Sequence, residues 1–225
     1  MYLHSLLADV PAREREAWVR KLQLQHLRRN ELLLDVDDET DCVFCVASGL
    51  LRLAVPASDR SEVTTDFICK DDFFAGTGLN EASHPIDARL VAVLPSSVYR
   101  IPKPALLGMC HRHPSVAGRL IDIMLKRTSI LRRQILRISS SSTEQLVQRT
   151  LHELTKLAPT DSGGYDKRIT QSVIASFSGL SREKVNKTIR QMELRGLVHK
   201  DDCAVHIVDE REHEALAARW HSRPG

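Results

Sequence analysis

A helical stretch near the C-terminal end of the sequence carries polar side chains that have the groups needed to read DNA bases. At about 100° per residue one arc of this stretch is apolar and the opposite arc is polar. The apolar arc holds Val185, Ile189 and Met192, and the polar arc holds Arg182, Glu183, Asn186, Lys187 and Arg190. Arginine can bond guanine with two donors, glutamate accepts from the cytosine amino group, and asparagine pairs with adenine. The pattern predicts a helix that lies in the major groove of double-stranded DNA.

The residues around this helix predict the elements that would position it. Thr170 can cap a preceding helix, Gly179 permits a positive φ at the bend, and Ser181 can cap the reading helix itself. Two short strands joined at Asp201-Asp202 are expected to follow, over Leu197–His199 and Cys203–Val208. A helix, a tight bend, a second helix and a hairpin together indicate a winged helix-turn-helix.

A long helix is predicted over residues 111–138, upstream of this motif. Apolar and polar residues recur there at alternating spacings of four and three, the pattern of a coiled-coil seam, at Val116, Leu120, Ile123, Arg127, Ile130 and Gln134. The seam predicts a homodimer, and the alternative is a helix that packs only on its own domain. The serine run Ser139–Ser142 is expected to break this helix as a hinge. Ser142 with Gln145 forms a capping box that begins the next helix.

The first half of the chain is expected to be mostly β. After helical character over Ala12–Leu27, short apolar runs alternate with polar turns. The predicted strands are Glu31–Val36, Cys42–Ala47, Gly49–Val55, Val63–Ile68, Ala88–Val93 and Ser97–Ile101, with turns at Asp37-Asp38, Ser48-Gly49, Ser58-Asp59 and Gly76–Gly78. We therefore predict an α+β fold with four parts: a β-roll sensor domain (1–110), a dimerisation helix (111–138), a hinge (139–142) and a DNA-binding domain (143–225).

The composition favours a cytoplasmic protein with a polyanionic partner. No secretory signal is found, and nowhere do about 18 apolar residues run together, so no membrane partner is expected. Residues 111–138 hold seven Lys/Arg against one acidic residue, and residues 167–200 hold eight against two. Local basic concentrations of this kind suit nucleic acid. The chain has no phosphate-loop, HExxH or GxSxG motif, so we expect no enzyme.

With these motifs in hand, the chain resembles the Crp/Fnr family of bacterial transcription regulators. The stretch "VIASFSGLSREKVNKTIRQMELRGLV" is similar to the family's winged helix-turn-helix, and "CVFCVASGLLRLAV" is similar to the strand pair of its effector β-roll. The resemblance implies that Arg182 and Glu183 contact base edges and that Lys187 stands where the family usually has arginine. It also implies that phosphates are held by Thr170, Gln171 and Ser181, and that an activator of this kind would contact RNA polymerase.

The same resemblance places a candidate effector pocket but argues against cyclic AMP. Family members that bind this nucleotide carry Gly-Glu for the ribose and Arg-Ser or Arg-Ala for the phosphate. Here Ala75-Gly76 and Ile86-Asp87 fall at those places, and the hydroxyl pair used for adenine falls at Leu131-Arg132. The candidate pocket residues are Gly76, Thr77, Gly78, Asp87, Ala88, Arg89, Thr128, Leu131 and Arg132. The alternative function is a cyclic-nucleotide or other small-molecule binding module with secondary DNA affinity.

The cysteine and histidine residues do not predict a metal site. They also do not identify the effector that the β-roll would bind. Cys42 and Cys45 form a CxxC, but on an extended strand residues three apart point to opposite faces, so core thiols are expected. The N-terminal cysteine cluster of the family's oxygen sensors is absent, which argues against an iron–sulfur cluster. The local candidate for haem or metal binding is Cys110-His111-Arg112-His113, whose alternative is solvated polar residues at a helix start.

Overall fold

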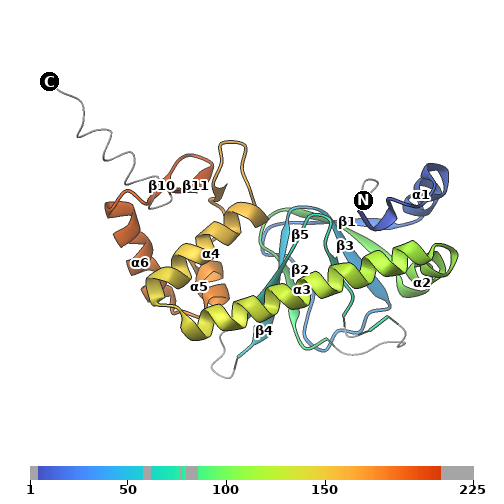
Figure 1. Ribbon diagram of the computed structural model, residues 1–225, viewed down its shortest axis with the longest axis horizontal. Coiled ribbons are helices and arrows are strands. Elements are labelled where there is room, and N and C mark those ends of the chain that lie inside the picture. The colour runs from blue at the N-terminus through green and yellow to red at the C-terminus, as the bar shows by residue number, and fades with distance from the viewer. Residues whose placement is uncertain (1–4, 58–61, 77, 80–85, 209–225) are drawn as a thin grey trace. The chain divides into compact units, whose positions relative to one another are not determined.

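The computed structural model describes residues 5–57, 62–76, 78–79 and 86–208 of the 225-residue chain. The chain divides into two compact units, residues 1–136 and 137–225. The first unit is built around strands and the second mostly from helices (Figure 1). No helix in the described ranges is long and apolar enough to cross a membrane.

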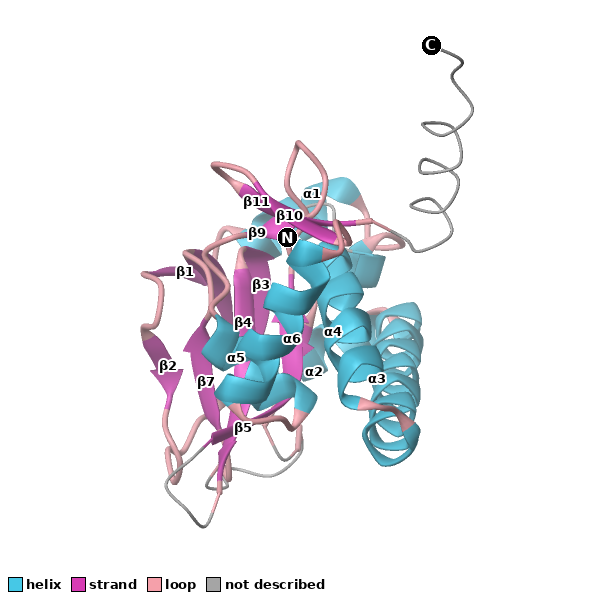
Figure 2. Cartoon of the chain, turned by 90° about the vertical axis from the view of Figure 1, so that its left-hand side faces the viewer, coloured by secondary structure: helices cyan, strands magenta, loops and turns pink. Residues whose placement is uncertain are grey.

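Two antiparallel four-stranded sheets form the β-roll of the first unit, and Figure 2 shows their strands in magenta. The first sheet has the order β1 (Gln23–Leu27), β8 (Ser96–Pro102), β3 (Cys42–Ser48) and β6 (Phe73–Phe74). The second has the order β2 (Leu32–Leu34), β7 (Arg89–Ala92), β4 (Leu50–Pro56) and β5 (Glu62–Cys69). The predicted α+β class and β-roll are confirmed.

The six predicted strands are all present, and the two additional strands show what pattern alone missed. The helical prediction over Ala12–Leu27 is wrong beyond α1 (Ala12–Val19), because β1 pairs in register with β8. Leu24 is exposed and Leu27 is buried, so the strand follows the needs of the sheet rather than a helical period. Strand β6 has only two residues, too few for an alternating pattern.

The predicted turn at Gly49 joins β3 and β4 and requires glycine. Gly49 has φ of 88°, and a Cβ atom there would lie 2.4 Å from the Pro95 carbonyl oxygen. The Ser96 hydroxyl accepts the hydrogen bond of the Leu50 amide beside it, at 3.1 Å. A side chain at Gly49 would therefore push the turn between β3 and β4 away from Pro95 and Ser96.

The predicted helix over residues 111–138 is two helices. Helix α2 (Lys103–Arg112) ends before His113, and α3 (Pro114–Ser140) begins at the following proline. Proline disfavours helical geometry in the residue before it, which explains the break. Helix α3 also runs through Ser139 and Ser140, so the serine run ends the helix later than predicted. The other helical elements of this unit are α1 and a short 3₁₀ turn, η1 (Ser5–Leu7), near the N-terminus.

The predicted coiled-coil seam is wrong for most of its length, because that face of α3 packs on its own β-roll. Val116 and Leu120 are buried at 0% and 9% exposure, and Ile123 packs against the same cluster. Arg127 reaches the roll to bond Asp66. Ile130, at 38% exposure, is the most exposed apolar residue of the predicted seam.

The second unit begins with the predicted capping box. The Ser142 hydroxyl accepts from the Gln145 amide at 3.3 Å, and the Gln145 side chain accepts from the Ser142 amide at 3.1 Å. The elements of this unit are α4 (Thr143–Leu157), β9 (Tyr165–Asp166), α5 (Gln171–Ser178), α6 (Arg182–Leu194), β10 (Val198–Lys200) and β11 (Ala204–Ile207). The wing is confirmed, and β9 adds a third strand to it.

Candidate nucleic-acid interface

Both caps and the bend of the predicted helix-turn-helix are present. Thr170 accepts a hydrogen bond from the Val173 amide at 3.4 Å, and Ser181 accepts one from the Lys184 amide at 3.3 Å. Gly179 between them has φ of 70°, the left-handed conformation that glycine adopts without a steric penalty. The local sequence therefore fixes where α5 stops and where α6 starts.

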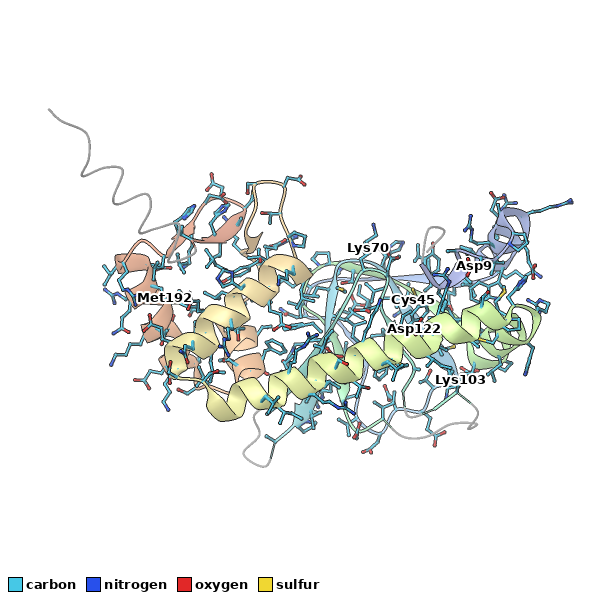
Figure 3. The ribbon with its side chains drawn as sticks, in the orientation of Figure 1. Asp9, Cys45, Lys70, Lys103, Asp122 and Met192 are labelled. Atoms are coloured by element: carbon cyan, nitrogen blue, oxygen red, sulfur yellow. The ribbon has the colours of Figure 1, made fainter. Side chains whose placement is uncertain are left out.

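The inner face of α6 is anchored in the core of the second unit. Val185, Ile189 and Met192 are 0%, 3% and 1% exposed, as the sequence predicted. Helix α6 packs on α4 and α5, which bury their own apolar residues Leu151, Leu154, Ile174 and Phe177. Figure 3 labels Met192 on the inner side of α6. This packing sets the rotation of α6 about its axis and so determines which residues face outward.

The outer face of α6 presents all five predicted reading residues to solvent. Arg182, Glu183, Asn186, Lys187 and Arg190 are exposed. All but Arg182 line a shallow open groove along α6, which the start of α5 and the end of β10 complete with Gln171 and Lys200. A helix with an open polar flank of this kind can lie against a large ligand rather than enclose a small one.

The cations of this surface differ in how far they are neutralised. Arg182, Lys187 and Arg190 form no ion pair with the described residues. Lys200 pairs with Glu193, and Arg195 pairs with Glu144. Arg168 pairs with Asp166 at 2.5 Å, and Asp166 holds the pKa of Arg168 above its ordinary value. Uncompensated positive charge is therefore concentrated on α6.

Two family models match this chain in the order of its units. Residues 24–113 match the cyclic nucleotide-binding domain, and residues 142–216 match the Crp-like helix-turn-helix domain. The chain belongs to the Crp/Fnr family of transcription regulators. In this family arrangement the β-roll is the sensor domain and the helix-turn-helix is the DNA-binding domain, so the groove along α6 lies on the DNA-binding domain.

Curated relatives agree with this assignment, and a solved structure shares the fold. The transcriptional activator protein Anr of Pseudomonas protegens is 23% identical over 194 residues, 85% of this chain and 79% of the relative. The cAMP-activated global regulator CRP of Pasteurella multocida is 22% identical over 168 residues, 74% of this chain and 80% of the relative. The structure of FixK2 from Bradyrhizobium japonicum has a TM-score of 0.74 at 17% identity, covering 86% of this chain and 96% of that one.

The candidate effector residues of the β-roll do not converge on one described site. Gly76 and Asp87 are exposed, Gly78 is half-buried, and Ala88 is buried beside Ile86 in the apolar core. Thr77 lies outside the described residues. The position expected to carry a phosphate-binding arginine is therefore Ile86, a core residue at 2% exposure.

Arg89 is the nearest cation, and it is already held by two carboxylates. It donates to Asp35 at 2.7 Å and to Glu62 at 2.8 Å. These hydrogen bonds raise the pKa of Arg89, and the hydrogen bond from Arg89 lowers the pKa of Asp35. A phosphate at this place would have to compete with both carboxylates.

The α3 candidates lie on the open side of the helix. Thr128, Leu131 and Arg132 are exposed. The Thr128 hydroxyl donates to the Met124 carbonyl at 3.0 Å, and the Ser129 hydroxyl donates to the Leu125 carbonyl at 3.0 Å. Both hydroxyls therefore satisfy their donors within the helix.

Cys42 and Cys45 are buried core residues, as predicted. Cys45 and Cys42 lie in separate apolar clusters, so the two sides of β3 carry them as predicted. Burial raises the pKa of Cys45 to about 12. Cys69 donates to Asp72 at 3.3 Å, and burial raises its pKa to about 12. Within the described ranges no group of three or more His, Cys, Asp or Glu residues could hold a metal ion.

The haem candidate around residues 110–113 lies at the junction of α2 and α3. Cys110 is half-buried against the core, and His111 is exposed. His113 Nε2 lies 2.9 Å from Glu14 Oε2 on α1. The haem hypothesis stays a prediction, and His113 would have to leave Glu14 to take part in it.

The ion pair between Arg127 and Asp66 was not predicted from the sequence. The sequence pattern placed Arg127 on a dimer seam, whereas the side chain crosses to β5. A single arginine in a regular apolar pattern was the available signal, because an arginine that faces a core needs an acidic partner.

Proposed function

We propose that the protein acts in the cytoplasm as a homodimeric, sequence-specific regulator whose two α6 helices enter the major groove at two half-sites. The carrying observation is the outer face of α6, which presents unpaired cations together with Glu183 and Asn186. Under this proposal Arg182 and Glu183 contact base edges at the start of the helix, and Asn186, Lys187 and Arg190 extend the reading face.

The caps of α5 and α6 would hold the DNA backbone. Thr170 and Ser181 use a hydroxyl lone pair to accept from a backbone amide, so each hydroxyl hydrogen is left to donate to a phosphate oxygen. Gln171 adds an amide donor in the same groove as Lys187. Contacts of this kind position a protein on DNA without specifying sequence.

The dimer would form through a different face of α3 from the predicted seam. Its outer stripe is a set of exposed large apolar side chains, Ile121, Met124, Leu125, Leu131, Ile135 and Leu136. Four of them are at least 60% exposed: Ile121, Leu125, Ile135 and Leu136. Exposed apolar stripes of this size mark protein contacts, and two copies packed through them would place two α6 helices on one DNA site.

The effector under this proposal is a small molecule other than cyclic AMP. The relative CRP is named as cAMP-activated, but here Ile86 occupies the core and Arg89 is held by Asp35 and Glu62. Calorimetry with cyclic AMP should show no binding in the micromolar range. If the regulator is an activator, as the relative Anr is named, RNA polymerase is its further partner.

A matched pair of lysines tests the reading face. Lys187 lines the α6 groove, whereas Lys184 is exposed on the same helix outside it. Selection of binding sites from random duplexes should return an altered base preference for Lys187→Ala and the wild-type preference for Lys184→Ala. The same preference for both variants and wild type would remove α6 as the reader. Tight small-molecule binding without sequence preference would favour a ligand-binding module with secondary DNA affinity.

A further inference from the structure

A single charged residue interrupts the outer stripe of α3. At about 100° per residue, Arg132 falls inside the arc that Leu131 and Leu136 bound. Arg133 falls about 100° further round the helix, outside that arc. Arg132 is therefore a guanidinium placed among side chains that are otherwise suited to an apolar contact.

Arg132 also differs from other arginines of α3 in its partners. Arg119 donates to Asp9 at 2.8 Å, and Arg127 donates to Asp66. Arg132 has no acidic partner among the residues that the structure describes, and Asp122 is the one acidic residue in the sequence of α3. Asp122 lies more than two helical turns away, too far to neutralise Arg132.

The dimer proposed above would bring two copies of Arg132 together. In a symmetric packing of two parallel α3 helices through their outer stripes, each residue at the contact faces its own copy. The helix axes then lie about 8–10 Å apart. Two guanidinium groups at this separation repel one another, and the apolar stripe around them excludes the water that would screen the repulsion. The nearby hydroxyls of Thr128 and Ser129 are directed to their own helix.

We propose that the two Arg132 side chains of the dimer bind one phosphate-type oxyanion at the symmetry axis, so that the ligand joins the subunits. This inference rests on the proposed homodimer. A guanidinium presents paired donors that match a phosphate group, and an anion between two of them replaces repulsion with charge-assisted hydrogen bonds. One subunit supplies only half of this site, so binding of the anion would stabilise the dimer.

Sedimentation equilibrium at neutral pH tests this site in the full chain. The dissociation constant of the dimer is measured in sodium chloride, in inorganic phosphate and in adenosine 5′-monophosphate at matched ionic strength. We expect a phosphate-bearing anion to tighten the wild-type dimer by about tenfold, the gain of one charge-assisted hydrogen bond. Tightening by inorganic phosphate points to the free ion, and tightening by the nucleotide alone points to an organic phosphate.

Two variants of matched chemistry assign the effect. Arg132→Leu should dimerise more tightly in chloride than wild type and should lose the response to anions, whereas Arg133→Leu should keep it. Arg132→Gln keeps a polar side chain and should also lose the response. A wild-type dimer indifferent to every anion, or an equal response in Arg132→Leu, overturns the site alone. A wild type that stays monomeric at micromolar concentration overturns the proposed dimer as well.

Discussion

Arg127 Nη2 on α3 lies 2.5 Å from Asp66 Oδ2 on β5, which joins the long helix to an edge strand of the β-roll. The two side chains are 17% and 18% exposed. Arg127 also donates to the carbonyl of Phe73 on β6, a strand of the other sheet. Burial raises the pKa of Asp66 even though Arg127 opposes that shift. The Arg127 guanidinium and the Asp66 carboxylate therefore neutralise each other in a largely buried, low-dielectric environment between α3 and the β-roll.

Removal of Arg127 should destabilise the first unit strongly. Arg127→Met leaves the Asp66 carboxylate buried without its cation, and breaking a buried pair in this way costs about 3–5 kcal/mol. Urea unfolding measures the loss. Arg119→Met is the control, because its pair with Asp9 is 38% and 49% exposed, and a surface pair contributes about 0–1 kcal/mol. Equal losses in the two variants would show that the buried pair has no special role.

The DNA-binding domain was predictable from the sequence because its signals are local. Thr170, Gly179, Ser181 and the capping box at Ser142 each act within a few residues, and the structure has every one of them. The face of α3 was not predictable in this way. Alternating spacings of four and three fit two faces of that helix, and the choice between them depends on where the roll packs, which involves Asp66 far away in the sequence.

Substitutions on the two faces of α3 should separate dimerisation from folding. Leu125 on the outer stripe is 61% exposed, whereas Ile123 packs against the core of the roll. Leu125→Asp should give a folded monomer with weak DNA binding, since two half-sites are no longer engaged together. Ile123→Asp should lower the melting temperature of the protein instead. Sedimentation and circular dichroism distinguish them, and a dimeric Leu125→Asp would place the interface elsewhere.

Arg89 should make the stability of the roll sensitive to acid. The hydrogen bond from Arg89 lowers the pKa of Asp35. Burial raises the pKa of Glu62, but the hydrogen bonds from Arg89 and Arg52 together outweigh burial and lower it. Carboxyl groups with depressed folded pKa values stabilise the fold above their unfolded pKa and lose that contribution as the pH falls through the folded value. The wild type should therefore exceed Arg89→Met in melting temperature at neutral pH.

The two melting temperatures should converge as the pH falls from about 5 to about 2. Arg20→Met is the matched control, because its ion pair with Glu16 spans 3.7 Å and Arg20 is 81% exposed. That variant should follow the wild type at every pH. A constant gap between wild type and Arg89→Met down to the lowest pH would exclude ion pairing as the cause.

The cysteines should differ sharply in reactivity. At pH 8 a thiol whose pKa is about 12 has a thiolate fraction on the order of 10⁻⁴, and the thiolate is the nucleophile. Cys45 and Cys69 should therefore resist iodoacetamide in the folded protein, while exposed Cys203 should react first. Peptide mass spectrometry follows each site over time. Comparable rates at Cys45 and Cys203 in the folded state would contradict the burial of β3.

Arg182 and Glu183 provide the sharpest test of base reading, because removing their opposite charges has opposed effects on non-specific binding. Each bidentate base contact contributes about 1–3 kcal/mol of discrimination, so Arg182→Ala should relax the preference at one base pair in each half-site while non-specific affinity falls much less. Glu183→Ala should loosen selection for cytosine and strengthen non-specific binding, since an anion facing the DNA is lost.

Backbone contacts should respond differently from these two residues. Lys167 is exposed and forms no ion pair within the described part of the chain, whereas Lys200 is paired with Glu193. Lys167→Ala should weaken binding to all sequences alike and reduce the slope of log affinity against log salt by about one unit. Lys200→Ala should change that slope less, because the charge of Lys200 is already neutralised by Glu193. Titrations of one specific and one random duplex over a range of salt concentrations measure both slopes. If all four variants lost affinity for both duplexes in the same proportion, α6 would attract DNA by charge alone and the assignment of Arg182 and Glu183 to base edges would be wrong.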